Sequence, residues 1–362
     1  MSIRQAGRDG AFLSSAAMTN RLLVLGPSWL GDAVMAIPTY RELRRRFPHA
    51  RLGILARRAV AGLYEAIPVF DEVMVYDRPK GAGRFLPYAD LVGRLEKFNA
   101  DTALVLPRSL GAAWTALIAG TPRRIGYATR VRRFLLTEAV DRDPSLLRTH
   151  RVHYYQHLLA PLGGVPAAEA PHFDVPAGAR ESAAHLLAPL AQAAGPLVVF
   201  NPGANYGSAK QWPEDRYAEL GRRLRARFDA SIVFVGGPGD RSVCDRIAHE
   251  IRGSASNEPI LDLAGKTSIL ELGAVLAASR LVVTNDTGAM HVAQAVGSTI
   301  VAIFGSTDPV TTAPYGEQHR IVREPVECSP CLLRECPIDH RCMVRVDVDR
   351  VFNACADAFE RP

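Results

Sequence analysis

Short runs of β-branched and other apolar residues alternate with amphipathic segments of helical length along most of the chain. Such alternation is typical of parallel sheets whose strands are joined by crossover helices. In the first half it predicts strands at residues 21–25, 51–55, 72–76 and 102–106, and helices at residues 32–47, 59–66, 85–98 and 110–119. Pro38 predicts a kink or a late start in the first helix, because proline lacks an amide hydrogen.

The alternation breaks between residues 142 and 196, where prolines, glycines and alanines surround two helical pieces at 154–162 and 179–191. Beyond it, strands are predicted at residues 197–201, 232–235, 260–263, 281–284 and 299–304, and helices at residues 214–228, 240–251, 269–278 and 288–296. We therefore expect two doubly wound domains. Their ligand crevices lie at the carboxyl ends of the strands, so the cleft between the domains is the expected site.

The chain length of 362 residues fits two domains of about 150 residues each. We expect these domains at residues 18–178 and 179–345, preceded by a disordered extension at 1–17 and followed by a C-terminal helix at 346–362. Met18 directly precedes the first strand, which suggests the hypothesis that the natural chain starts there.

The composition excludes several classes of protein. Hydrophobic residues make up 48% of the chain and charged residues 22%, as in ordinary globular proteins. No apolar run approaches the ~20 residues that span a bilayer. The net charge of +6, with clustered arginines, favours an anionic partner such as a phosphorylated substrate or a membrane face. Nucleic acid is not expected, because no nucleic-acid-binding module is present.

The first turn of chemical interest follows the opening strand and runs from Gly26 to Asp32. Gly26 and Gly31 allow a sharp turn, which brings the Asp32 carboxylate to the start of the next helix and to the cleft. Most aspartates at such a position cap a helix N-terminus, so capping is the competing interpretation.

Two further turns follow strands of the second domain. The turn that begins with Asn201 and Gly203 leads to Lys210, just before a predicted helix. A lysine there offers a diphosphate a positive charge beside free amides, whereas the alternative is an ordinary surface lysine. The glycine-rich turn at 236–240 ends in Asp240, which is either a helix cap or a ribose partner. This turn lacks the full dinucleotide fingerprint.

The turn at residues 285–291 is the most informative, because it joins a strand directly to a helix and carries Asp286, Thr287, Gly288 and His291. The first amides of a helix lack partners within the helix, so those near Thr287 and Gly288 can bind phosphate oxygens. His291 lies within reach of the same ligand. A lone histidine at a helix start is more often a structural hydrogen-bonding residue.

Five segments in this order resemble glycosyltransferase family 9, and within it the heptosyltransferase II branch. They are LGPSWLGD at residues 25–32, NPGA at 201–204, KQWP at 210–213, NDTGAMH at 285–291 and GSTDP at 305–309. The resemblance spans residues 21–345 and implies an α/β fold of the GT-B type, with two Rossmann-like, doubly wound parallel-sheet domains facing a cleft. It also implies inverting transfer of heptose from ADP-heptose to the inner core of lipopolysaccharide.

The resemblance implies roles for individual residues. Asp32 would be the general base that takes the proton of the acceptor hydroxyl. Lys210 and the amides of Thr287 and Gly288 would stabilise the charge on the departing ADP, with no metal or cofactor. Asp286 is expected to hold its turn through backbone amides or to bind a sugar hydroxyl. The implied donor-binding residues are Asn201, Gly203, Lys210, Asp240, Asp286, Thr287, Gly288 and His291.

The implied acceptor is heptosyl-Kdo-lipid A, bound by the first domain. Arg108, Arg124, Arg130 and Arg133 are the candidates for its anionic groups, because a guanidinium forms paired hydrogen bonds with phosphate or carboxylate. The expected location is the cytoplasm, with peripheral contact to the inner face of the cytoplasmic membrane.

Three alternatives stay open. One is a family 9 heptosyltransferase of the first or third kind. Another is a nicotinamide-dependent oxidoreductase, which the missing glycine fingerprint disfavours. The third is a non-catalytic protein that binds nucleotide sugars, against which Asp32 and Lys210 argue.

Four of the six cysteines lie close together in the sequence near the end of the second domain, with His340 among them: Cys328, Cys331, Cys336 and Cys342. Such spacing predicts either a structural zinc site or reduced, unliganded thiols. Disulfides are not expected in a cytosolic enzyme.

Overall fold

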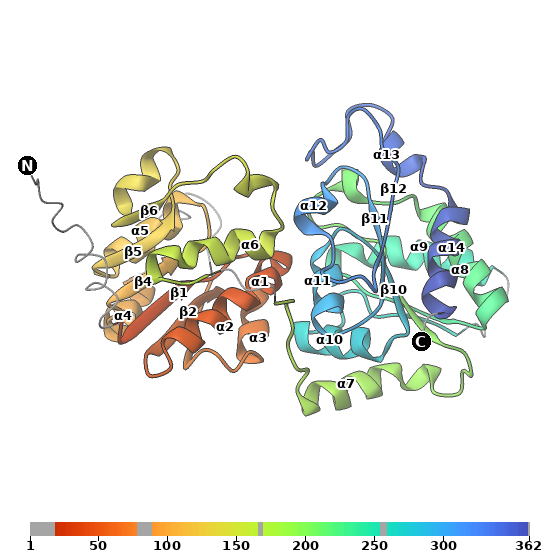
Figure 1. Ribbon diagram of the computed structural model, residues 1–362. Helices are drawn as coiled ribbons and strands as arrows, with labels where there is room; N and C mark the ends of the chain where they lie inside the picture. The colour runs from red at the N-terminus through yellow and green to blue at the C-terminus, as the bar shows by residue number, and fades with distance from the viewer. Residues whose placement is uncertain (1–18, 78–88, 166–168, 254–258, 361–362) are drawn as a thin grey trace, which may run out of the picture.

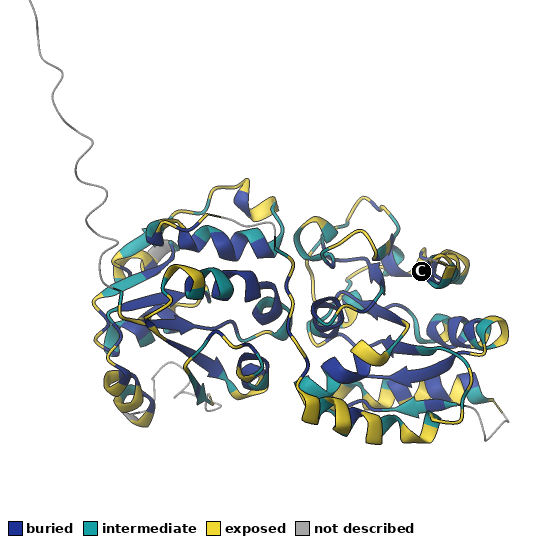
Figure 2. Cartoon of the chain, turned by 60° about the horizontal axis from the view of Figure 1, so that its bottom comes forward, coloured by how far each residue is buried: buried dark blue, intermediate teal, exposed yellow. Residues whose placement is uncertain are grey.

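The computed structural model describes residues 19–77, 89–165, 169–253 and 259–360, so the extension expected at 1–17 lies outside the described residues. The chain folds into two α/β domains that lie next to each other (Figure 1). Each domain contains one six-stranded sheet in which every pairing is parallel. Figure 2 shows the strands buried at the centre of each domain and the exposed residues on the outer faces of the helices.

The first sheet has the strand order β3-β2-β1-β4-β5-β6. Its strands are β1 (Arg21–Leu25), β2 (Arg51–Arg57), β3 (Glu72–Tyr76), β4 (Thr102–Val105), β5 (Arg123–Tyr127) and β6 (Glu138–Val140). The covering helices are α1 (Leu30–Met35), α2 (Ile37–Arg46), α3 (Arg58–Glu65), α4 (Ala89–Phe98), α5 (Leu110–Ile118) and α6 (Arg151–Gln156), with 3₁₀ turns η2 (Arg130–Leu135), η3 (Leu146–Arg148) and η4 (His157–Leu162). Helices cover both faces, which explains why the central strands are continuous apolar runs.

The second sheet has the order β12-β11-β10-β7-β8-β9, so the crevice between β7 and β10 is its topological switch point. Its strands are β7 (Leu197–Asn201), β8 (Ser231–Phe234), β9 (Ile260–Asp262), β10 (Leu281–Asn285), β11 (Ile300–Phe304) and β12 (Arg320–Arg323). Its helices are α7 (Ala177–Leu187), α8 (Glu214–Phe228), α9 (Arg241–Arg252), α10 (Ile269–Ala278), α11 (Gly288–Ala295), α12 (Pro309–Thr312), α13 (Arg341–Val344) and α14 (Val348–Glu360), with 3₁₀ turns η5 (Ala188–Leu190), η6 (Ser208–Lys210) and η7 (Pro238–Asp240). The C-terminal helix α14 packs against α8 of this domain (Figure 1).

Most of the expected elements are confirmed, and the differences have local causes. The helix expected at residues 32–47 is broken at Ala36 into α1 and α2, and Pro38 lies in the first turn of α2, where a missing amide hydrogen costs least. The sequence did not predict β5, β6 and β12, which are short or begin with charged residues.

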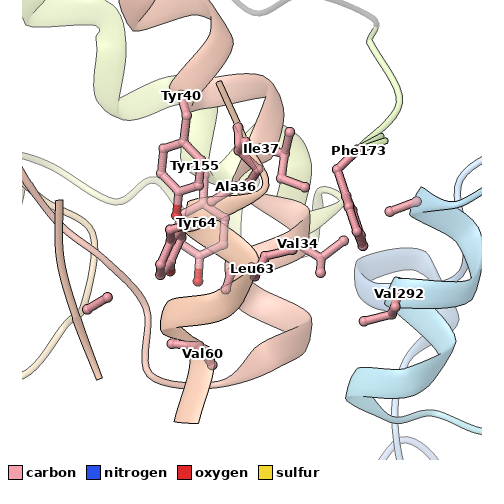
Figure 3. Close-up of a cluster of buried hydrophobic side chains, with 14 of the residues drawn as sticks. Val34, Ala36, Ile37, Tyr40, Val60, Leu63, Tyr64, Tyr155, Phe173 and Val292 are labelled. Carbon is pink, nitrogen blue, oxygen red and sulfur yellow. The ribbon is translucent and has the colours of Figure 1, made fainter. Parts of the chain in front are cut away.

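An apolar cluster continues across the boundary between the domains. Phe173, on the segment that joins them, lies between Val34 of α1 and Val292 of α11 (Figure 3). The amide of Phe173 donates a 3.1 Å hydrogen bond to the carbonyl oxygen of Ala295. The shared apolar packing stabilises one arrangement of the two domains.

The N-terminal turns of α1 and α11 meet at this boundary. A Cβ atom at Gly31 would lie 2.7 Å from Cδ2 of His291, and one at Gly288 would lie 3.0 Å from Cβ of Leu30. Glycine at both positions therefore allows the two helix starts to approach closely. Within the described residues, no helix combines the length and apolar character needed to cross a membrane.

We predict that Gly31→Ala lowers kcat/KM of the transfer activity that the sequence resemblance implies on the order of 10²-fold, because the added methyl group displaces the His291 ring and shifts the domains by roughly an ångström or less. Steady-state kinetics with saturating donor measures the loss. Each domain should still unfold as in the wild type, as followed by circular dichroism.

Gly62→Ala is the matched control, because no heavy atom lies within 4 Å of a Cβ built at this position in α3. It should leave kcat/KM unchanged and raise the free energy of unfolding by about 0.5–1 kcal/mol. Equal activity of the two variants would contradict the role of the close contact.

Candidate active site

A cleft of about 540 Å³ lies where the two domains meet. From the first domain it is lined by the start of α1 and by Arg108; from the second it is lined by the loops that follow β7, β8 and β10. The loops all leave the carboxyl ends of parallel strands, as expected for this kind of fold. The cleft brings together these predicted site residues: Asp32, Arg108, Asn201, Gly203, Lys210, Asp240, Asp286, Thr287, Gly288 and His291.

Asp32 lies in the first turn of α1 but does not cap the helix. Its Oδ1 atom accepts a 2.8 Å hydrogen bond from the hydroxyl group of Tyr155 in α6. The N-terminus of α1 has no side-chain cap, so the capping interpretation is wrong. Figure 3 shows Tyr155 near Tyr40 and Tyr64, which belong to the same buried cluster.

Burial is the largest influence on Asp32 and raises the pKa of its carboxyl group. The hydrogen bond from Tyr155 and the positive charges of Arg151 and Arg108 lower this pKa, whereas the charge of Asp286 raises it. A carboxylate with increased proton affinity that borders a cleft is suited to take a proton from a hydroxyl group.

Lys210 lines the cleft from the second domain and is held by Asp286. Its ammonium group donates to Asp286 Oδ2 at 2.7 Å and to the Asp286 carbonyl oxygen at 3.2 Å, and the two side chains are only 14% and 5% exposed. Because an ammonium group has three protons, one remains for a ligand. Asp286 thus binds Lys210, a contact that the sequence did not predict, and its expected contact with a sugar hydroxyl stays a prediction.

Asn201 and Thr287 use their side chains to join β7, β10 and α11. The Asn201 Oδ1 atom accepts hydrogen bonds from the hydroxyl groups of Thr287 at 2.7 Å and Thr284 at 3.2 Å, and its Nδ2 atom donates to the Val235 carbonyl oxygen. What this corner offers a ligand is therefore the backbone amides at the start of α11, near Gly288.

Asp240 connects two of the glycine-rich loops. Its carboxylate accepts a 2.8 Å hydrogen bond from the amide of Gly237, and a Cβ atom at Gly203 would lie 2.2 Å from its carboxyl carbon. Glycine at position 203 is thus required for the loop to lie against Asp240. The hydrogen bond caps the 3₁₀ turn η7, whereas the Asp240 side chain does not cap α9, and the ribose role stays a prediction.

His291 lies in the second turn of α11 and is only 3% exposed. Burial lowers its pKa to about 4, so the imidazole is neutral near pH 7. Its Nδ1 atom has no hydrogen-bond partner among the described residues, which argues against a purely structural role. A neutral imidazole beside Gly31 can accept or donate one hydrogen bond to a ligand.

The four predicted acceptor arginines do not lie together. Arg108 lines the cleft, but Arg124 is the second residue of β5, at the opposite end of the strands, and donates to the carbonyl oxygens of Thr121, Pro122 and Leu135. The predicted role of Arg124 is therefore wrong. Arg133 is exposed on η2 and does not line the cleft, while the side chain of Arg130 lies outside the described part of the structure.

Several site residues were missed by sequence reasoning. Tyr155 and Arg151 come from the irregular stretch between the domains, where no motif marks them. Trp29, Tyr206 and Arg334 also line the cleft. Trp29 and Tyr206 lie inside or next to the recognised turns, so exposed aromatic residues beside glycine turns were the available signal.

The cysteine-rich segment packs against the loop that carries Lys210. His340 Nε2 lies 3.1 Å from the Ala209 carbonyl oxygen, and the amide of His340 donates to Cys336 Sγ at 3.2 Å. All six cysteines are free of disulfides. No three His, Cys, Asp or Glu side chains are placed to share a metal ion in the described part of the chain.

Two Rossmann-like parallel-sheet domains with a shared ligand cleft define the GT-B class of glycosyltransferases, and the turn chemistry fits that class. Residues 89–341 match the profile of glycosyltransferase family 9 (heptosyltransferase), and the chain belongs to this family. It is therefore a glycosyltransferase, which decides against the nicotinamide-dependent oxidoreductase.

Individual relatives support the same family. The chain is 30% identical to lipopolysaccharide heptosyltransferase 2 of Salmonella typhimurium over 312 residues, covering 84% of this chain and 88% of that protein. It is 30% identical to lipooligosaccharide heptosyltransferase 2 of Haemophilus influenzae, covering 83% and 88% of the two chains. The solved structure of the ADP-heptose LPS heptosyltransferase II of E. coli superimposes with a TM-score of 0.79 at 27% identity, over 93% of this chain and 98% of that one.

We predict that Tyr155→Phe moves the acidic limb of the pH profile of kcat/KM to higher pH. The lost hydrogen bond stabilises the ionised form of Asp32, so its removal raises the pKa of this carboxyl group, and the base is ionised only at higher pH. Tyr64→Phe is the control, because its hydroxyl group donates to Pro27 instead. An acidic limb that moves equally in both variants would argue against this coupling.

We predict that Lys210→Met destabilises the protein by about 3–5 kcal/mol, because it leaves the buried Asp286 carboxylate unpaired. The double variant Lys210→Met/Asp286→Asn should regain most of this stability in urea unfolding and should still lack transfer activity. Recovery of activity together with stability would mean that Lys210 acts only as a structural residue.

Proposed function

We propose that this protein transfers heptose from ADP-heptose to heptosyl-Kdo-lipid A in the inner core of lipopolysaccharide, with inversion at the anomeric carbon. The observation that carries the proposal is a cleft in which Asp32 lies on one domain, and Lys210 and the start of α11 lie on the other. The relatives at 30% identity, named heptosyltransferase 2, favour this acceptor over those of the first and third enzymes.

In this proposal the donor diphosphate binds between Lys210 and the first amides of α11. The remaining proton of the Lys210 ammonium group and the helix N-terminus both stabilise negative charge. As the bond from the anomeric carbon to the diphosphate breaks, charge grows on the diphosphate, and these preorganised donors stabilise it most strongly at that stage. The departing ADP therefore needs no protein acid.

On the other side of the cleft, Asp32 takes the proton of the attacking hydroxyl group while the new glycosidic bond forms. Attack from the face opposite the diphosphate inverts the anomeric carbon. Tyr155 orients the Asp32 carboxylate through its hydroxyl group, which leaves Oδ2 for the acceptor. No step of this scheme uses a metal ion or a cofactor.

The proposed acceptor is anchored in a membrane by its lipid A. We propose that the enzyme works in the cytoplasm and reaches the inner face of the cytoplasmic membrane by peripheral contact, which the net charge of +6 supports at an anionic surface.

Incubation of the purified protein with ADP-heptose and heptosyl-Kdo-lipid A tests the proposal. Mass spectrometry should show the acceptor gaining one heptose and ADP released in equal amount. Asp32→Asn should lower kcat by about 10²–10⁴-fold with little change in ADP affinity, because only proton transfer is lost.

Asp349→Asn is the matched control, because this aspartate lies on the outer helix α14 with its side chain 75% exposed. It should transfer heptose at the wild-type rate. Absence of a mass gain with every inner-core acceptor would refute the proposed function.

A further inference from the structure

A group of arginines lies at the carboxyl edge of the first sheet, next to Arg108 of the cleft. Arg132 belongs to η2, Arg142 follows β6, and Arg151 opens α6. Within the described residues, none of these arginines forms an ion pair with a carboxylate. The group therefore carries positive charge without a directly paired carboxylate in the described part of the chain.

Arg132 is 1% exposed and marks the edge of the sheet. Its guanidinium donates to the carbonyl oxygens of Tyr127 at 2.5 Å and Val105 at 3.2 Å, the last residues of β5 and β4. A Cβ atom at Gly126 would lie 2.9 Å from Nη2 of Arg132, so glycine leaves room for this side chain. The Nε atom of Arg132 is buried without a hydrogen-bond partner among the described residues.

Tyr154 completes the group. Its ring packs on the Tyr127 ring at 4.4 Å between centroids, and the Arg151 guanidinium lies 5.0 Å from its centre. Tyr154 is 2% exposed, and its hydroxyl group has no partner in the described structure. The buried Nε atom of Arg142 also has no hydrogen-bond partner in the described structure. Arg142 belongs to the same place in the fold, because it follows β6, whose Val140 is paired with Tyr127.

A structural role explains only part of this arrangement. Two strand-end carbonyl groups accept hydrogen bonds from the Nη atoms of Arg132. Three buried polar groups remain without a partner among the described residues: the Nε atoms of Arg132 and Arg142 and the Tyr154 hydroxyl. Buried polar groups without partners are costly, and so is a buried cation without an anion. Burial, together with the charges of Arg142 and Arg108, lowers the pKa of Arg132 to about 10, which agrees with an excess of positive charge.

We propose that Arg108, Arg132, Arg142 and Tyr154 bind an anionic group of the acceptor, a phosphate or a carboxylate. The inference rests on the proposed function. In place of Arg124, it assigns residues that lie near the carboxyl ends of the strands, where the cleft is. Arg108 lines the cleft that contains Asp32, and its charge acts on both Asp32 and Arg132. An acceptor anion held here therefore positions the neighbouring sugar hydroxyl beside the base.

Two conservative variants test the site. Arg142→Gln and Tyr154→Phe should each raise KM for heptosyl-Kdo-lipid A roughly 10- to 100-fold, because each removes one hydrogen bond to a charged group. KM for ADP-heptose should stay at its wild-type value. Arg227→Gln, an exposed position in the last turn of α8, controls for the loss of one positive charge and should leave both constants unchanged.

Modified acceptors identify the anionic group. One acceptor lacks the phosphates, and a second has the Kdo carboxyl groups converted to methyl esters. The KM penalty of both variants should disappear with the acceptor that lacks the bound group. A penalty that persists with both modified acceptors, or no penalty with any acceptor, overturns the site.

Inorganic phosphate provides a test that does not depend on the reaction. It should raise the melting temperature of the wild type more than that of Arg142→Gln or Tyr154→Phe. Equal stabilisation of all three proteins overturns the inference. If the wild type transfers heptose while acceptor KM is unchanged in both variants, only this inference fails; if the wild type transfers none, the proposed function fails as well.

Discussion

The close approach of two helix N-termini is the constraint on which the site depends. Gly31 of α1 lies against the His291 ring of α11, and Gly288 of α11 lies against Leu30 of α1. No larger side chain fits at Gly31 without displacing a buried ring. Asp32 follows Gly31 directly, so this contact sets how far the carboxylate stands from the first amides of α11.

The charged groups on the two sides of the cleft are held in different ways. Asp286 holds Lys210 with one carboxylate and leaves one ammonium proton for a ligand. Asp32 forms no ion pair within the described residues, and the hydrogen bond from Tyr155 and the more distant charges of Arg151 and Arg108 only partly offset the effect of burial. This keeps the proton affinity of Asp32 above that of an exposed aspartate. The site therefore has a strong base on one wall and a fixed cation on the other.

The fold could be predicted where strands are buried on both faces. β1, β7, β10 and β11 are apolar runs, so their own composition identifies them. β5 begins with two arginines and β6 has only three residues, and these strands form because neighbouring strands supply their partners. Such pairing across the sheet leaves no local pattern in the sequence.

Because β5 was not predicted from the sequence, Arg124 was wrongly assigned to acceptor binding. Arg124 lies at the start of β5 and Arg132 follows its end, so the two lie at opposite ends of the strands. The sequence shows that arginines cluster here, but it does not show at which end of the strands each arginine lies unless β5 is recognised. The glycine turns around Asp32, Lys210 and Gly288 could be predicted from the sequence. A sharp turn or a close approach of the backbone to a ligand requires glycine, and glycine is visible in the sequence.

A crystal structure of the protein with ADP tests the central claim most directly. We expect the diphosphate oxygens within hydrogen-bond distance of Lys210 Nζ and of the first amides of α11, with the Asp32 carboxylate facing them across the cleft. A nucleotide bound away from both Lys210 and α11, or an Asp32 side chain turned out of the cleft, would contradict the account.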